Sequence, residues 1–131
     1  LENSNEIQLK RRAIWERYFT GLSEWASSYK VSLPFIPDYC VQSYHMFYLL
    51  LPAEKDREKF IRYLSEHKIA AVFHYLPLDI SKMGSKLALV DQAQCPVSAN
   101  ISDCIVRLPF FYGLEITDQK RIIDTIVNYA V

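Results

Sequence analysis

The sequence is poor in glycine, with only three glycines in 131 residues. A loop that cradles phosphate through backbone N–H groups needs several glycines close together. The chain also contains no GxGxxG, Walker, GxSxG or HExxH pattern. The sequence therefore lacks the usual phosphate loop, serine-nucleophile turn and zinc helix.

Cysteine is equally sparse, and no two cysteines form a CxxC pair; they are Cys40, Cys95 and Cys104. An odd, scattered set predicts neither a zinc site nor a redox pair. The three histidines also lack the spacing of metal ligands, so we expect no metal site. We expect idle or buried thiols in a reducing compartment.

The chain has no excess of either charge, since fifteen basic residues balance fifteen acidic ones. A neutral balance gives no electrostatic footprint for nucleic acid or an anionic membrane. No apolar run approaches the roughly 20 residues of a spanning helix, and residues 1–10 are too polar for a secretory leader. We therefore expect a cytoplasmic protein. Because the chain starts with Leu1 and enters a long helix at once, we also expect it to be part of a larger protein.

Hydrophobic residues make up half of the chain and aromatic residues 14%, which suits one folded domain with a proper core. Apolar residues at steps of three and four predict helices over 6–29 and 53–67 and a final helix capped by Thr117. Pro96 is expected to begin a short helix over 96–103. Residues 79–94 are predicted to form a loop, with a short helix over 84–90.

Three apolar runs, each stopped by a proline, predict strands over 44–51, 69–75 and 105–108. Both faces of 44–51 are apolar, so we expect this strand to be central or covered on both sides, with His45 packed. The run 69–75 is expected to be a buried strand. The order of elements predicts an α/β two-layer sandwich with a small sheet.

His74 and Tyr75 are the candidate site residues, because they follow the run Ile69–Phe73 and precede Pro77. Side chains at the ends of strands in α/β layers often meet ligands. The alternative is a core histidine beside a half-buried tyrosine.

Three stretches together resemble one family. They are Arg11–Tyr18, the pair His45–Tyr48 and Ala71–Leu78, and the run from Cys95–Ser98 to Arg107–Leu114. In this order and spacing they are similar to the C-terminal part of the DegT/DnrJ/EryC1/StrS pyridoxal-phosphate sugar aminotransferases. The resemblance implies that residues 1–131 form the small C-terminal domain of a fold-type I enzyme. Its long helix 6–29 would be followed by an α/β (α+β) sandwich over 31–131 with a mainly antiparallel three-stranded sheet.

The resemblance also implies a reaction for the full-length parent. Pyridoxal phosphate would accept an amino group from glutamate, and the 4-keto carbon of a dTDP-4-keto-6-deoxyhexose would receive it. The product would feed bacterial surface polysaccharide, such as enterobacterial common antigen. In this family the catalytic lysine and the cofactor-binding residues lie in an N-terminal domain, which would act in a homodimer. This chain alone would then be inactive and hold no cofactor.

His74 and Tyr75 match the family's His–Tyr pair, which faces the sugar nucleotide. Two positions depart from the family pattern, namely Asp79 in place of a frequent histidine and Ala99 in place of a frequent glutamate. If the chain is such a domain, part of its surface should be apolar and the isolated chain should self-associate. The aromatic faces of 6–29 and 44–51 are the candidates. The rival interpretation is a stand-alone α/β ligand-binding or protein-interaction module without catalysis.

Overall fold

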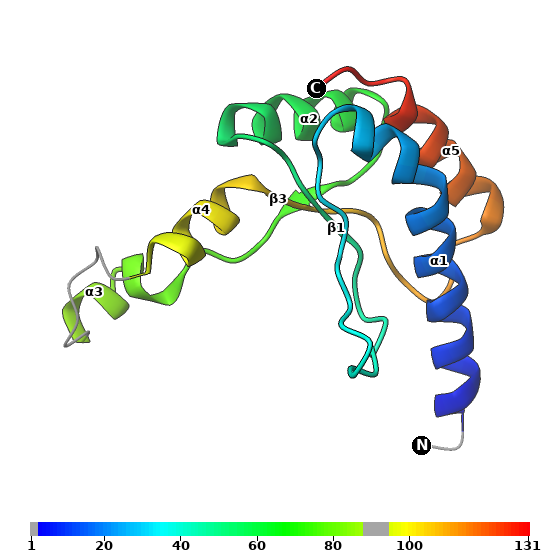
Figure 1. Ribbon diagram of the computed structural model, residues 1–131, viewed down its shortest axis with the longest axis horizontal. Helices are drawn as coiled ribbons and strands as arrows, with labels where there is room; N and C mark the ends of the chain where they lie inside the picture. Colours follow the sequence, from blue (N-terminus) through cyan, green and yellow to red (C-terminus); the bar gives the residue numbers. More distant parts are fainter. Residues whose placement is uncertain (1–2, 88–94) are drawn as a thin grey trace.

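The last strand of the chain lies in the middle of the sheet (Figure 1). In the computed structural model, which describes residues 3–87 and 95–131, β3 (Ile105–Arg107) pairs with both β1 (Tyr48–Leu50) and β2 (Val72–Phe73). Both pairings are antiparallel. The predicted α+β sandwich with a small antiparallel sheet is confirmed.

Three helices contribute most of the helical layer, namely α1 (Ser4–Ser28), α2 (Glu54–Glu66) and α5 (Ile116–Val127). α4 (Pro96–Cys104) extends from the sheet in the opposite direction in Figure 1. Short helical turns over Leu78–Ile80 and α3 (Gly84–Leu87) lie near its far end. No helix in the described ranges has the length and apolar character of a membrane span.

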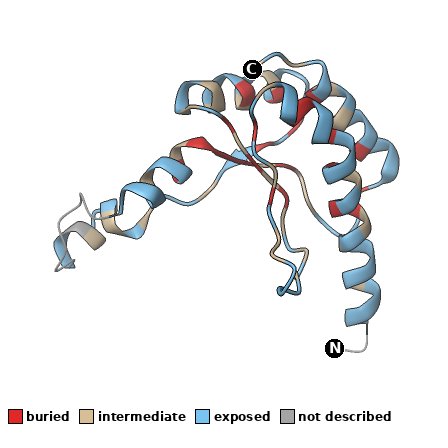
Figure 2. Cartoon of the chain, in the orientation of Figure 1, coloured by how far each residue is buried: buried red, intermediate tan, exposed pale blue. Residues whose placement is uncertain are grey.

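Aromatic rings join α1 to the sheet. Phe47, which precedes β1, is fully buried, and its ring centroid lies 5.5 Å from that of Trp15 and 5.1 Å from that of Tyr18. The Tyr18 hydroxyl donates to the carbonyl of Pro109 at 2.9 Å, and burial raises the pKa of this phenol. Buried residues concentrate where the helices face the sheet (Figure 2). Tyr18 thus ties α1 to the chain that follows β3.

A buried amide connects α1 to α5. Gln119 is completely buried, and its side-chain oxygen accepts a 2.6 Å hydrogen bond from Arg17 Nε. Its side-chain nitrogen donates to the carbonyl of Ile14, also at 2.6 Å. A Cβ on Gly21 would lie only 3.0 Å from Ile123, so the two helices approach closely at this point. Both polar ends of the amide are satisfied, which makes its burial tolerable.

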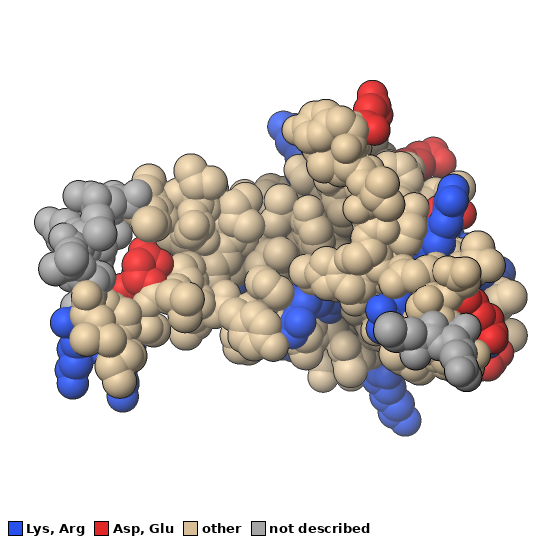
Figure 3. Space-filling model, turned by 90° about the horizontal axis from the view of Figure 1, so that it is seen from below, with Lys and Arg blue, Asp and Glu red and all other residues tan. Residues whose placement is uncertain are grey.

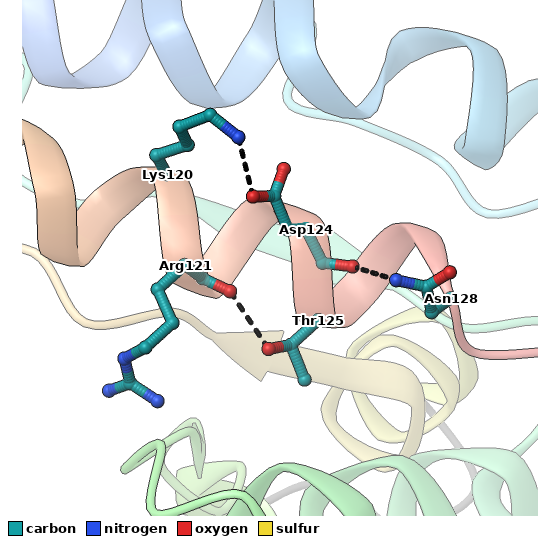
Figure 4. A network of polar contacts seen from close by, with 5 residues as sticks. All are labelled: Lys120, Arg121, Asp124, Thr125 and Asn128. Atoms are coloured by element: carbon teal, nitrogen blue, oxygen red, sulfur yellow. Dashed lines mark hydrogen bonds and ion pairs between the residues drawn. The ribbon is translucent and has the colours of Figure 1, made fainter.

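The outer surface of α5 carries mainly local polar contacts (Figure 4), and Arg121 also donates to the carbonyl of His67 at the end of α2 at 3.1 Å. Lys120 Nζ lies 2.6 Å from Asp124 Oδ2, and Thr125 and Asn128 bond to carbonyls one turn earlier. Exposed pairs one turn apart contribute only about 0.3–0.5 kcal/mol. This face therefore stabilises the helix locally.

The predicted helices agree with the structure, but the predicted cap does not. The bounds of α1, α2 and α4 fall within two residues of the predicted ranges. α5 begins at Ile116 with Glu115 as its N-cap, so Thr117 lies inside the helix. Of the predicted helix over 84–90, residues 84–87 are helical, and 88–90 lie outside the described residues.

The predicted strand positions were wrong in two respects. The run 69–75 forms only the two-residue strand β2, where Val72 is 44% and Phe73 56% exposed. The strand over 44–51 shortens to β1, which lies at the edge of the sheet. His45 is exposed and not packed. The short run 105–108 supplies the central strand instead, because β3 pairs with β1 on one side and with β2 on the other. On its outer side β1 has only the isolated bridge between Leu50 and Ser32.

We expect Gln119→Ala to lower the free energy of unfolding by about 2–4 kcal/mol, because it removes two buried hydrogen bonds and leaves Arg17 Nε without its acceptor. Urea denaturation measures this change. Thr117→Ala is the matched control on the same helix. Its side chain is exposed and it does not serve as the cap, so its cost should stay within about 0.5 kcal/mol. Equal costs for the two variants would contradict the role of the amide.

Candidate functional site

The register of the sheet divides its residues between two faces. Leu49 and Val106 are paired, fully buried and part of the core beneath the helices. Tyr48, Arg107 and Val72 form the adjacent row of paired residues and project to the other face, because side chains alternate along a strand. Tyr48 and Arg107 are partly buried and Val72 is exposed. We call the face that carries this row the open face.

His74 follows Val72 by two positions and belongs to the same face. It is partly buried, and its Nδ1 atom is buried without a hydrogen-bond partner. The Tyr75 ring lies 5.1 Å from the imidazole, centroid to centroid. The guanidinium carbon of Arg107 lies 5.5 Å from the centre of the Tyr75 ring. His74, Tyr75 and Arg107 therefore form one cluster, contributed by β3 and the segment after β2.

Burial lowers the pKa of His74 below its ordinary value of 6.5, and the charges of Arg107 and His45 lower it further. A lowered pKa keeps the imidazole neutral at pH 7, so one ring nitrogen can donate and the other accept. The fold is therefore less stable below pH 6.5 than above it, because the unfolded chain then binds the proton on this imidazole more readily than the folded chain does.

Two helices hold the His74–Tyr75 segment in place. Ser102 Oγ on α4 donates to the carbonyl of Tyr75 at 3.3 Å. Arg57 on α2 in turn donates to the carbonyl of Ser102 at 2.7 Å. Ser102 is buried although its residue type is usually exposed. The segment after β2 is therefore anchored through its backbone.

The structure brings the two predicted site residues together and adds Arg107. Asp79, one of the departures from the family pattern, is partly buried in the turn Leu78–Ile80, and Ala99 lies on α4. Sequence reasoning assigned no role to Arg107. A signal was present, because Arg107 is the one cation in the apolar run Ile105–Leu108.

The chain does not provide the lysine that a pyridoxal-phosphate enzyme needs. Such a lysine is shielded from solvent and has a depressed pKa. Every lysine here is exposed. Lys10 lies 4.2 Å from the centre of the Tyr112 ring, and its contact with Tyr112 raises its pKa. The residues present therefore do not fit a Schiff-base site.

Metal and thiol chemistry find no support either. The described residues hold no group of three or more acidic, histidine or cysteine side chains arranged for a metal ion. The three cysteines are free, and burial raises the pKa of the Cys104 thiol. Cys40 and Cys95 are exposed, so the expectation of buried thiols holds for Cys104 alone.

Exposed apolar side chains lie largely elsewhere than predicted, although Leu9 and Phe19 on α1 are exposed. Trp15, Tyr18 and Trp25 on α1 are buried, so the aromatic face of 6–29 is core. Large exposed residues occur instead in the connector before β1 and in the segment after β2: Phe35, Tyr39, Val41, Leu76, Leu78, Met83 and Leu87. Seen from below, the molecule shows mostly uncharged residues (Figure 3).

One groove of about 690 Å³ lies between the start of α1 and residues 41–44. Its lining includes Leu9, Arg12 and Val41, but none of His74, Tyr75 and Arg107. The candidate cluster therefore lies outside this groove.

Comparison with known proteins defines the class to which this fold belongs. The model of the DegT/DnrJ/EryC1/StrS aminotransferase family matches residues 1–127. The chain belongs to the DegT/DnrJ/EryC1/StrS aminotransferase family.

Solved structures show the same fold. The aminotransferase TlmJ from Streptoalloteichus hindustanus is similar with a TM-score of 0.80 and 23% identity, over 97% of this chain and 32% of that one. PseC from Helicobacter pylori, an aminotransferase involved in the biosynthesis of pseudoaminic acid, gives 0.74 and 18%, over 92% and 32%. NtdA from Bacillus subtilis, with bound cofactor PMP, gives 0.73 and 16%, over 91% and 27%. The chain thus spans a third or less of the length of these structures.

We expect the imidazole of His74 to titrate with a midpoint below 6.5, because burial and the neighbouring Arg107 disfavour its charged form. NMR of the ring carbons as a function of pH measures this midpoint. In Arg107→Gln the midpoint should rise only in part, since burial is the larger cause. A wild-type midpoint at or above 6.5 would contradict the geometry described for this cluster.

Proposed function

We propose that this chain is the small C-terminal domain of a pyridoxal-phosphate-dependent nucleotide-sugar aminotransferase. The full-length enzyme transfers an amino group from glutamate to the 4-keto carbon of a dTDP-4-keto-6-deoxyhexose, as a dTDP-4-amino-4,6-dideoxygalactose transaminase does. The product enters bacterial surface polysaccharide of the enterobacterial common antigen type. The enzyme is a cytoplasmic homodimer, and this chain alone is inactive.

The observation that carries the proposal is the family match over residues 1–127 in a chain about a third as long as the solved relatives. The exposure of every lysine supports the assignment of the Schiff-base lysine to a separate domain. NtdA binds PMP, the aminated form of the same cofactor, which supports this cofactor chemistry for the parent. The cofactor, when bound, would act as the electron sink for amino transfer.

Within that enzyme, His74 and Tyr75 contact the sugar nucleotide. The imidazole is neutral at pH 7, so His74 can donate to or accept from a sugar hydroxyl. Tyr75 is largely exposed, and its phenol can do the same. The hydrogen bond from Ser102 fixes the backbone of this segment before substrate arrives, which reduces the entropic cost of binding.

We expect the full-length protein to convert a dTDP-4-keto-6-deoxyhexose and glutamate into a dTDP-amino sugar, which mass spectrometry of the products detects. His74→Ala should lower kcat/KM for the sugar about tenfold, the loss expected for one substrate hydrogen bond. His67→Ala, an exposed histidine at the end of α2, is the control. Absence of amino transfer to every nucleotide-linked 4-keto sugar tested would refute the proposal.

We expect the native gene product, measured by intact mass from its source cells, to be much heavier than the 15.3 kDa of this chain, because the solved relatives are about three times as long. A native mass near 15.3 kDa would leave no room for a domain with the pyridoxal lysine. The rival function, a stand-alone binding or interaction module, would then replace the aminotransferase proposal.

A further inference from the structure

Arg107 is a partly buried cation without an anionic partner among the described residues. Its Nε atom is buried and makes no hydrogen bond. The ion pairs found in the described ranges are Arg12–Glu16, Arg57–Glu54 and Lys120–Asp124, none of which involves Arg107. A charge removed from water costs free energy unless a partner compensates it. Arg107 therefore lies where a partner from outside these residues would lower the free energy.

A second unsatisfied group lies on the same face. His74 Nδ1 is buried and also has no partner. Val72, two residues before His74, is the cross-strand neighbour of Arg107. Arg107 lowers the pKa of His74, which is consistent with their proximity. Two nitrogen atoms that lack partners thus belong to residues of the open face.

The geometry of the cluster limits what can bind there. The Tyr75 ring lies 5.5 Å from the guanidinium carbon and restrains its position through a cation–π contact. A restrained guanidinium presents its N–H groups as a planar fork, which matches the oxygens of a phosphate or a carboxylate. An apolar group at this place would leave the guanidinium charge uncompensated, and a cation would be repelled.

We propose that Arg107, with His74 beside it, binds an anionic oxygen group of a reactant on the open face. This inference rests on the proposed function only for the identity of the reactants. The anion would be either the diphosphate of the sugar nucleotide or a carboxylate of the amino donor. Both offer paired oxygens to the guanidinium, and the experiment distinguishes them.

The experiment is isothermal titration of the full-length protein with two probes, inorganic pyrophosphate and glutarate. Arg107→Gln should weaken the binding of one probe about tenfold or more, because one charge-assisted contact is lost. Loss of pyrophosphate binding assigns the site to the nucleotide, and loss of glutarate binding assigns it to the amino donor. Arg107→Lys keeps the charge but not the fork, so it should recover only part of the affinity.

Arg62→Gln is the matched control, because it removes the same charge from an exposed position on α2. The inference would be overturned if Arg107→Gln bound both probes with dissociation constants within twofold of those of the wild type. Such unchanged affinities would point to a protein carboxylate from outside this chain as the partner of Arg107. Equal weakening in Arg62→Gln, or no binding of either probe to the wild-type protein, would overturn it as well.

Failure of this inference is separate from failure of the proposed function, since the titration needs no turnover. An active aminotransferase with unchanged probe binding would refute the anion site alone. A protein that transfers no amino group but loses pyrophosphate or glutarate binding in Arg107→Gln would keep the anion site and lose the proposed reaction. Arg107→Lys serves as the folded variant if Arg107→Gln does not fold.

Discussion

The structure depends on the double pairing of β3. Neither β1 nor β2 pairs with the other, and each is only two or three residues long. A two-stranded hairpin of this length is marginal in water. When β3 enters between them, Val106 becomes fully buried beneath the helices, next to Leu49. The core and the sheet therefore form together, and neither is stable without the pairing of β3, residues 105–107.

The same pairing builds the candidate site. Because side chains alternate along a strand, the burial of Val106 forces Arg107 onto the opposite face. The pairing with β2 then brings the segment that follows Val72 alongside Arg107. A shift of one residue in the register would put Arg107 in the core and Val106 on the open face, at a large cost in desolvation. Core packing thus fixes the position of the cation.

Local signals and non-local pairing explain what the sequence could and could not predict. Helices such as α1 and α2 follow from spacing within the segment itself, and their bounds were predicted within two residues. The order of the strands depends on partners about 30–60 residues away, as in the pairing of Arg107 with Val72 and Tyr48. The run 69–75 is strongly apolar, yet only Ile69 and Ala71 are buried and β2 becomes an exposed edge, because composition does not specify which strand is central.

The candidate site likewise combines features that the local sequence indicates with contacts that depend on non-local pairing. His74 and Tyr75 were singled out from the strand end and the family resemblance, and their role stays a prediction. Arg107 stands out in the sequence as a cation in an apolar run, but its contact with Tyr75 could not be predicted, since it joins segments more than 30 positions apart. Thr117 was predicted as a cap from its residue type alone, although the helix α5 begins one residue before it, at Ile116.

The open face has the character of one wall of a site. Ligand sites in enzymes are often formed between domains, where each wall alone is shallow. Here the cluster of His74, Tyr75 and Arg107 lies outside the groove between α1 and residues 41–44, and two of its nitrogens lack partners. A stand-alone binding module would have reason to satisfy those nitrogens within its own chain, because each buried unsatisfied donor costs about 1–3 kcal/mol. A domain that completes its site only against another surface can leave them unsatisfied until substrate and the second wall arrive. The arrangement of this face therefore favours the enzyme-domain proposal over the module, independently of the family match.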